Sequence, residues 1–108
     1  MTDIILIRVN CPTKDEAETL GAKAVEARLA ACANIDGPVK SIYEWDGAIE
    51  QGEEYVLWLK SKTELWPETQ AFIADQHSFD TPAILVLPCQ HADERYEAWL
   101  HSNTKSPV

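Results

Sequence analysis

This 108-residue chain contains three cysteines and three histidines, among them Cys11 and His77, and side chains of both types bind late transition metals strongly. A cysteine thiolate and a histidine imidazole are both good ligands for late first-row metals, and copper(II) heads the order of affinity. Two protein ligands hold a metal only weakly unless water, a carboxylate or a neighbouring chain completes the site. The two residue types therefore permit a metal site, but by themselves they do not identify its ligands.

Each of the two residues also has a structural interpretation. Cys11 lies at the end of a predicted strand, on its apolar side, where a free cysteine usually acts as a small buried hydrophobe. His77 follows a predicted helix, whose dipole favours a histidine at the C-terminus. The other cysteines and histidines have no clear ligand spacing, and we interpret them as structural or solvated: Cys32, Cys89, His91 and His101.

The negative net charge of the chain bears on which classes of partner it can bind. Eighteen acidic residues oppose nine basic ones, which gives a formal net charge of −9. Nucleic-acid binding depends on clustered lysine and arginine, so we expect no nucleic-acid partner. The acidic surface suits a cation, and it equally suits simple solubility. The acidic residues between positions 44 and 54 lack the spacing of a calcium loop and are interpreted as a solvated strand edge.

The sequence contains no motif that indicates an enzyme or a membrane protein. The chain shows no glycine-rich phosphate loop, nucleophile elbow or catalytic-triad spacing, and we expect no enzyme. The apolar run from Ile4 to Ile7 is too short for a signal peptide, and no run approaches the ~20 residues of a membrane span. An odd number of cysteines without a CxxC pair indicates reduced thiols, so we expect a cytoplasmic protein without a membrane partner.

Cys11 is positioned by the first predicted element, a strand over residues 4–11. Apolar residues alternate along it, and one face carries Ile5, Ile7, Val9 and Cys11. Pro12 ends the strand, because its nitrogen carries no hydrogen for the ladder.

A helix is predicted to follow directly. Thr13 and Glu16 form a capping box, in which the Thr13 hydroxyl accepts the Glu16 amide and the Glu16 carboxylate returns a bond. The helical spacing continues to about Ala31 with small residues on the inner side. Gly21 lies beside that side, which lets the helix approach a sheet closely.

The rest of the chain is predicted to form a hairpin, a strand and two helices. Strands are expected over residues 39–46, 55–62 and 83–87, and helices over residues 64–76 and 93–101. Asp46 and Gly47 are typical of a hairpin turn, residues 34–38 are typical of a loop or an irregular strand start, and Thr63 is a candidate helix cap.

This order predicts one α+β domain over residues 1–108. A strand–helix–strand–strand–helix–strand sequence fits a ferredoxin-like split βαβ sandwich, with an antiparallel sheet and an added C-terminal helix. The helices leave the other sheet face uncovered. Tyr43, Trp45, Val56 and Trp58 make that face too apolar for solvent, which indicates an interface between chains.

Three strings of residues carry a family resemblance that spans the chain from about residue 5 to residue 100. They are the run from Leu29 to Asn34, the run from Ser41 to Gly47, and the run from His77 to Pro88. Together they resemble the CutA family of divalent-cation tolerance proteins. The resemblance implies a homotrimer with its sheets packed inward, and copper(II) or another divalent metal as the ligand. It also implies Cys11 and His77 as metal ligands, with Glu54 at a position where the family often has an acidic residue.

The chain departs from the common family pattern near His77. Phe79 stands where a tyrosine is frequent, and Ala83 stands where a glutamate is frequent, so a hydroxyl and a carboxylate oxygen are lost. We expect a cytoplasmic homotrimer that binds a divalent metal, copper above all, and contributes to metal tolerance. The alternative is a regulatory or scaffolding trimer that resembles the PII signalling proteins, although the net charge of −9 disfavours anionic nucleotides.

Overall fold

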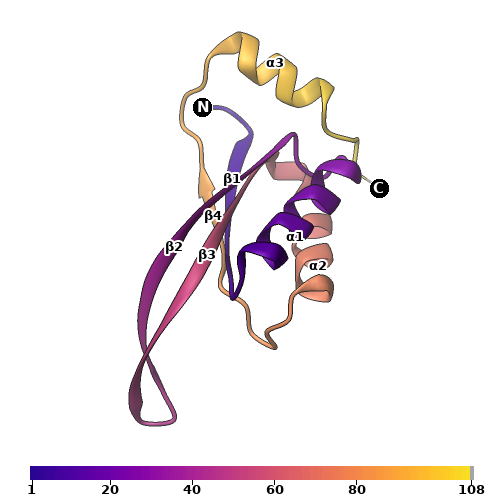
Figure 1. The fold of residues 1–108 in the computed structure, drawn as a ribbon. Helices are drawn as coiled ribbons and strands as arrows, with labels where there is room; N and C mark the ends of the chain where they lie inside the picture. Colours follow the sequence, from indigo (N-terminus) through magenta and orange to yellow (C-terminus); the bar gives the residue numbers. More distant parts are fainter. Residues whose placement is uncertain (108) are drawn as a thin grey trace.

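Four strands and three α-helices alternate along the chain in a computed structural model that describes residues 1–107. The elements are β1 (Ile4–Cys11), α1 (Lys14–Glu26), β2 (Cys32–Trp45), β3 (Ala48–Lys62), the short 3₁₀ helix η1 (Thr63–Leu65), α2 (Trp66–Gln76), β4 (Ile84–Pro88) and α3 (Glu94–Ser102). The strands form one antiparallel sheet in the order β2-β3-β1-β4, and α1 and α2 lie on one of its faces (Figure 1). The predicted ferredoxin-like α+β sandwich is therefore confirmed.

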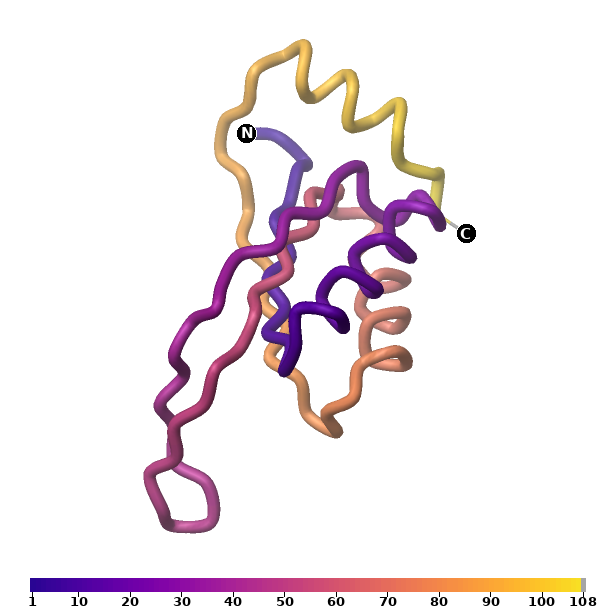
Figure 2. Tube along the Cα trace, in the orientation of Figure 1, coloured from indigo at the N-terminus to yellow at the C-terminus, as the bar shows by residue number. Residues whose placement is uncertain are grey.

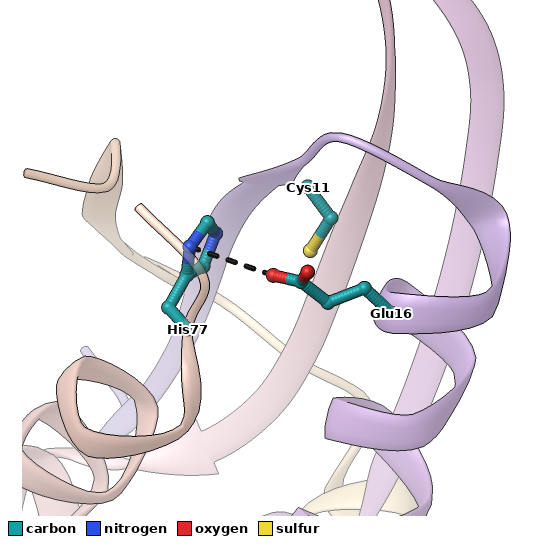
Figure 3. A group of neighbouring side chains, drawn as sticks. All are labelled: Cys11, Glu16 and His77. Carbon is teal, nitrogen blue, oxygen red and sulfur yellow. Dashed lines mark ion pairs between the residues drawn. The ribbon is translucent and has the colours of Figure 1, made fainter. Parts of the chain in front are cut away.

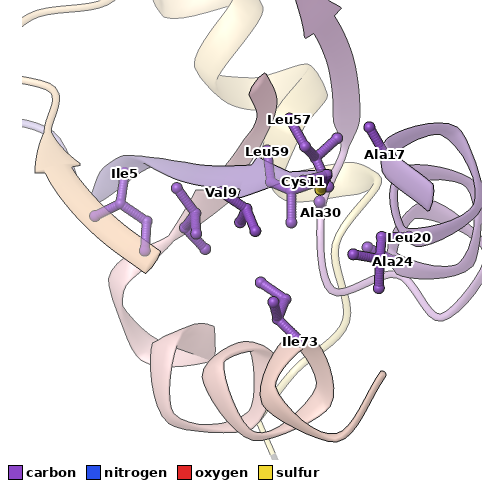
Figure 4. Packing of buried hydrophobic residues seen from close by; sticks show 11 residues of the cluster. Ile5, Val9, Cys11, Ala17, Leu20, Ala24, Ala30, Leu57, Leu59 and Ile73 are labelled. Atoms are coloured by element: carbon purple, nitrogen blue, oxygen red, sulfur yellow. The ribbon is translucent and has the colours of Figure 1, made fainter. Parts of the chain in front are cut away.

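The face of the sheet under α1 and α2, here called the helix face, holds the main core. The alternation predicted for β1 is confirmed, because Ile5, Ile7, Val9 and Cys11 all point into this core and are buried. They pack with side chains of both helices and of β3 (Figure 4), among them Leu20, Ala24, Leu57, Leu59 and Ile73. Burial of this apolar surface is the dominant favourable term in folding.

Gly21 allows α1 to lie close to the sheet. A Cβ atom at this position would lie 3.0 Å from the Cβ of Ala33 and 3.0 Å from the Cδ1 of Leu57. Ordinary carbon contacts need about 3.5–4.0 Å, so a larger residue would force the helix and the sheet apart.

The opposite face, here called the open face, is only partly covered. At one end α3 packs across it, with Leu100 buried beside Ile4 and the Lys60 ammonium over the Tyr96 ring. At the other end β2 and β3 extend beyond the body as a long hairpin (Figure 2). Tyr43 and Trp45 remain 49% and 66% exposed on it. The predicted apolar patch is thus present on the chain, although Val56 is already buried.

The hairpin turn was predicted correctly and the first helix was predicted too long. Asp46 and Gly47 join β2 to β3 with positive φ angles of 49° and 81°, as a type I′ turn requires. The helix ends at Glu26 instead of Ala31, since Arg28 adopts a left-handed φ of 59°. The small apolar residues after it belong to a turn and to the start of β2, which begins at Cys32.

Of the two alternatives for residues 34–38, the irregular strand start is present: these residues lie within β2, whose pairing with β3 shifts register between Asp36 and Val39. One local prediction was wrong. Thr63 does not cap α2, because its hydroxyl donates to the carbonyl oxygen of Asp3 instead. Within the described residues, no helix has the length and apolar character needed to cross a membrane.

Candidate metal centre at the end of β1

Three chain segments meet where β1 ends. Cys11 is the last residue of β1, Glu16 lies in the first turn of α1, and His77 is the C-cap of α2. Pro12 and the Thr13 cap turn the chain sharply from β1 into α1, which brings Glu16 back beside Cys11. The Sγ of Cys11, a carboxylate oxygen of Glu16 and a ring nitrogen of His77 all lie within 4.8 Å of one another (Figure 3).

Both ring nitrogens of His77 are engaged by the backbone. Nε2 lies 2.7 Å from the carbonyl oxygen of Asn10, and Nδ1 lies 3.0 Å from the amide nitrogen of Phe79. A carbonyl oxygen only accepts and an amide N–H only donates, so the proton is on Nε2 and the lone pair is on Nδ1. The Nδ1 lone pair is thus occupied by the Phe79 amide, and Nδ1 is the ring nitrogen that lies beside the Glu16 carboxylate.

The Glu16 carboxylate lies beside Nδ1 of His77. Its Oε2 lies 3.5 Å from Nδ1 of His77 and accepts the amide of Ser78 at 3.2 Å. The cap of α1 was predicted correctly, since the Thr13 hydroxyl accepts the Glu16 amide at 3.1 Å. The carboxylate, however, bonds to a residue 62 positions away. The Glu16 carboxylate thus connects the first turn of α1 to the segment that follows α2.

The thiol of Cys11 is protonated in this environment. Burial, and to a smaller extent the negative charges of Glu16 and then Glu54, raise its pKa to about 12. A cation placed among the three groups would reverse this effect, because a bound metal stabilises the thiolate.

Glu54 does not join this group of atoms. Strand partners share a face of the sheet, and Val56 is the partner of Asn10, so Glu54 lies on the open face while Cys11 lies on the helix face. The carboxylate of Glu54 accepts hydrogen bonds from the side chains of Asn10 and Ser41. Its negative charge influences Cys11 from the opposite side of the sheet.

Ala83 also belongs to the open face. Its carbonyl oxygen accepts the Asn10 amide at 3.2 Å, and its side chain lines a cleft there together with Glu54. The register thus places the position of the missing family glutamate beside Glu54 and away from the thiol of Cys11.

The arrangement offers sulfur, nitrogen and oxygen to a cation on one side of the sheet. A metal bound by all three would release the thiol proton, and it would replace the Phe79 amide at Nδ1 of His77. The donor set therefore fits a divalent late transition metal, and binding would be linked to a shift of the segment after α2.

Sequence reasoning found two members of this cluster and missed the third. Cys11 and His77 were identified as candidate ligands, and the structure brings them together. Glu16 was assigned only to the helix cap. Its place in the first turn after a strand that ends in a cysteine is a signal that could have identified it.

The fold and this cluster can now be compared with known proteins. The family described as CutA1 divalent ion tolerance protein matches residues 5–103. This chain belongs to the CutA1 family. The match covers all four strands and all three helices, which confirms the family resemblance of the sequence.

Individual CutA relatives are similar over nearly the whole chain. Protein CutA of Mus musculus is 34% identical over 91% of this chain, which spans only 55% of that relative's length. The divalent-cation tolerance protein CutA of Thermus thermophilus is 35% identical, over 96% of this chain and 99% of its own. The structure of the periplasmic divalent cation tolerance protein CutA from Archaeoglobus fulgidus matches with a TM-score of 0.91 and 29% identity, over 94% of this chain and 99% of that one.

Proposed function

We propose that this chain forms a homotrimer that binds a divalent metal ion, copper(II) above all, through Cys11, Glu16 and His77, and so contributes to metal-ion tolerance. The observation that carries the proposal is the convergence of three different donor atoms within 4.8 Å at the end of β1. Membership of the CutA1 divalent ion tolerance family supports the same class of ligand.

The electrostatics of the cluster favour a cation. Nδ1 of His77 and Oε2 of Glu16 lie 3.5 Å apart. The side chain of His77 is fully buried and that of Glu16 is 20% exposed, so water screens the negative charge of Glu16 only in part. A metal ion between these two atoms and the Cys11 sulfur would be attracted by the Glu16 carboxylate and would take the place of the Phe79 amide at Nδ1.

For Glu54 we propose a role through charge. Its carboxylate helps to keep the cluster negative from the opposite face of the sheet, and it is not placed to coordinate the same ion. For the location we propose the cytoplasm, because all three cysteines are free thiols, as a reducing compartment favours. The relative from Archaeoglobus fulgidus is named as periplasmic, so the cytoplasmic location proposed for this chain differs from the location in that relative's name.

The proposed site can be tested by calorimetry with copper(II) and zinc(II) on the wild type and on Cys11→Ser, Glu16→Gln and His77→Gln. We expect each substitution to weaken binding by roughly tenfold or more, because the loss of an outer partner alone already costs about 10–100-fold. Cys32→Ser is the matched control, since Cys32 is a free thiol outside the cluster, and it should bind as the wild type does.

A second readout reports on the thiolate directly. Cobalt(II) bound to Cys11 should produce a sulfur-to-metal charge-transfer absorption that Cys11→Ser abolishes and Cys32→Ser retains. Equal copper affinity in the wild type and in a Cys11→Ser, His77→Gln double variant would show that the proposed site is wrong.

The cleft on the open face supports a second candidate function, a regulatory trimer that binds a small ligand. It has a volume of about 910 Å³ and is lined by Arg8, three aromatic residues and three carboxylates: Tyr43, Trp45, Phe79, Glu50, Glu54 and Asp80. The single arginine among three acids disfavours an anion such as ATP. Calorimetry with ATP distinguishes the two candidates, since saturable binding would favour the regulatory one.

A further inference from the structure

A second cluster of potential ligands lies at the opposite end of β1. Asp3 immediately precedes β1, and Glu97 and His101 lie on α3, which crosses the sheet close to the N-terminal segment (Figure 1). A carboxylate oxygen of each acid and a ring nitrogen of His101 lie within 4.8 Å of one another. We propose that Asp3, Glu97 and His101 form a separate zinc-type metal site that ties the N-terminus to α3.

The helix presents two of the ligands on one side. Glu97 and His101 are four residues apart, so their side chains are neighbours along the surface of α3. Leu100 lies between them in sequence and is completely buried against Ile4, which fixes the rotation of the helix. This packing directs Glu97 and His101 toward the residue that precedes Ile4.

Asp3 is held in place from the other side. Its carbonyl oxygen accepts the amide of Thr63 at 2.8 Å and the hydroxyl of Thr63 at 3.0 Å. Its Oδ1 lies 2.9 Å from Nε2 of His101. The backbone of Asp3 is thus fixed by η1 while its carboxylate remains directed at α3.

The donor set matches zinc in type and number. Catalytic and other open zinc sites use three protein ligands from histidine and carboxylates, with water in the fourth position. Zinc binds such atoms at about 2.0–2.2 Å, so two ligands of one ion lie roughly 3 Å apart, as Asp3 and His101 already do. Zinc would replace the proton on Nε2 of His101, which passes to solvent. His101 is exposed, so an ion can reach the site from water.

The site is independent of the cluster at Cys11. The two lie at opposite ends of an eight-residue strand, which spans roughly 26 Å at ~3.3 Å per residue. They share no residue. The sequence interpretation of His101 as merely solvated missed this contact, because Asp3 and His101 are 98 positions apart.

The test is zinc(II) calorimetry and thermal unfolding on the full chain with four single substitutions. Asp3→Asn, Glu97→Gln and His101→Gln each remove one proposed ligand at the surface. Glu94→Gln makes the same change of charge on an exposed part of α3 outside the cluster and is the matched control. Zinc should also shift the ring signals of His101 in the NMR spectrum of the wild type.

We expect His101→Gln to reduce zinc affinity at this site at least tenfold, with smaller losses for the two carboxylates and none for Glu94→Gln. Zinc should raise the melting temperature of the wild type by mass action, and that part of the rise should disappear in His101→Gln. Unshifted His101 signals at saturating zinc, or equal zinc binding in the wild type and His101→Gln, would overturn the proposal. Cys11→Ser leaves these ligands intact, so the result is separate from the test at Cys11.

Discussion

The carbonyl oxygen of Asn10 accepts a 2.7 Å hydrogen bond from Nε2 of His77, which joins the end of β1 to the end of α2. This bond fixes the tautomer of a fully buried imidazole and directs its second nitrogen toward Glu16. The same ring accepts the Phe79 amide, so His77 organises the backbone as well as the candidate metal site.

Replacement of His77 by alanine should therefore reduce stability. The change leaves the Asn10 carbonyl and the Phe79 amide without their partners, and an unsatisfied buried polar group costs about 1–3 kcal/mol. Urea unfolding of the metal-free protein measures the effect. His91→Ala is the control, because His91 is exposed and should change the free energy of unfolding by no more than about 0.5 kcal/mol. Equal effects of the two substitutions would contradict the structural role.

Stability should fall in alkaline solution because of Cys11. The pKa of its thiol rises from 9.0 to about 12 on folding, chiefly through burial. Below pH 9.0 both states keep the proton, and above it the unfolded state loses the proton first, so this contribution is lost between pH 9.0 and about 12.

The linkage amounts to ~1.4 kcal/mol for each pH unit in that window. Alkaline solution also affects the rest of the chain, so the informative quantity is the difference between the wild type and Cys11→Ala. We expect a steeper loss of unfolding free energy with pH in the wild type. Parallel curves would show that Cys11 titrates normally in the folded protein.

Gly21→Ala should destabilise the protein although it improves helix propensity. The new Cβ would lie 3.0 Å from atoms of both Ala33 and Leu57, and overpacking of this kind typically costs about 1–3 kcal/mol. The propensity gain of ~1 kcal/mol can be measured separately with Ala22→Gly, on the exposed side of the same helix. A stabilised Gly21→Ala would mean that the helix can move away from the sheet at little cost.

Trp45→Asp should weaken the proposed trimer. The side chain is 66% exposed on the single chain, and an unpaired charge buried at an interface costs several kcal/mol. Light scattering should give about three times the chain mass for the wild type and a lower mass for the variant. Val25→Asp, on α1 in the helix layer, should leave the mass unchanged. A wild type that remains monomeric at micromolar concentration would refute the trimer.

Local sequence patterns predicted the parts of this fold that local forces decide. The alternation of β1 assigned Cys11 to the buried face, and the Thr13 cap set the start of α1. The end of α1 was missed because small apolar residues after Glu26 continue the helical pattern, and only the tertiary structure shows that they enter β2.

The candidate site was predictable only in part for the same reason. Cys11 and His77 were identified through the family resemblance, whereas Glu16 joins them through a bond to Ser78 that the local sequence does not indicate. The position of Glu54 depends on strand register. A register is a property of paired strands, so the sequence of β3 alone did not reveal that Glu54 and Cys11 face opposite ways.

Asn10 makes contacts on both faces of the sheet. Its carbonyl oxygen holds His77 on the helix side, while its side-chain amide donates to Glu54 and its side-chain oxygen accepts from Arg8 at 2.8 Å. Arg8 in turn lies over the Trp58 ring on the open face. A ligand that displaced His77 would also displace Asn10. Two further contacts, from Asn10 to Arg8 and from Arg8 to Trp58, would carry that displacement to the open face. The chain thus contains a short connection between its candidate metal site and the surface proposed to meet other chains.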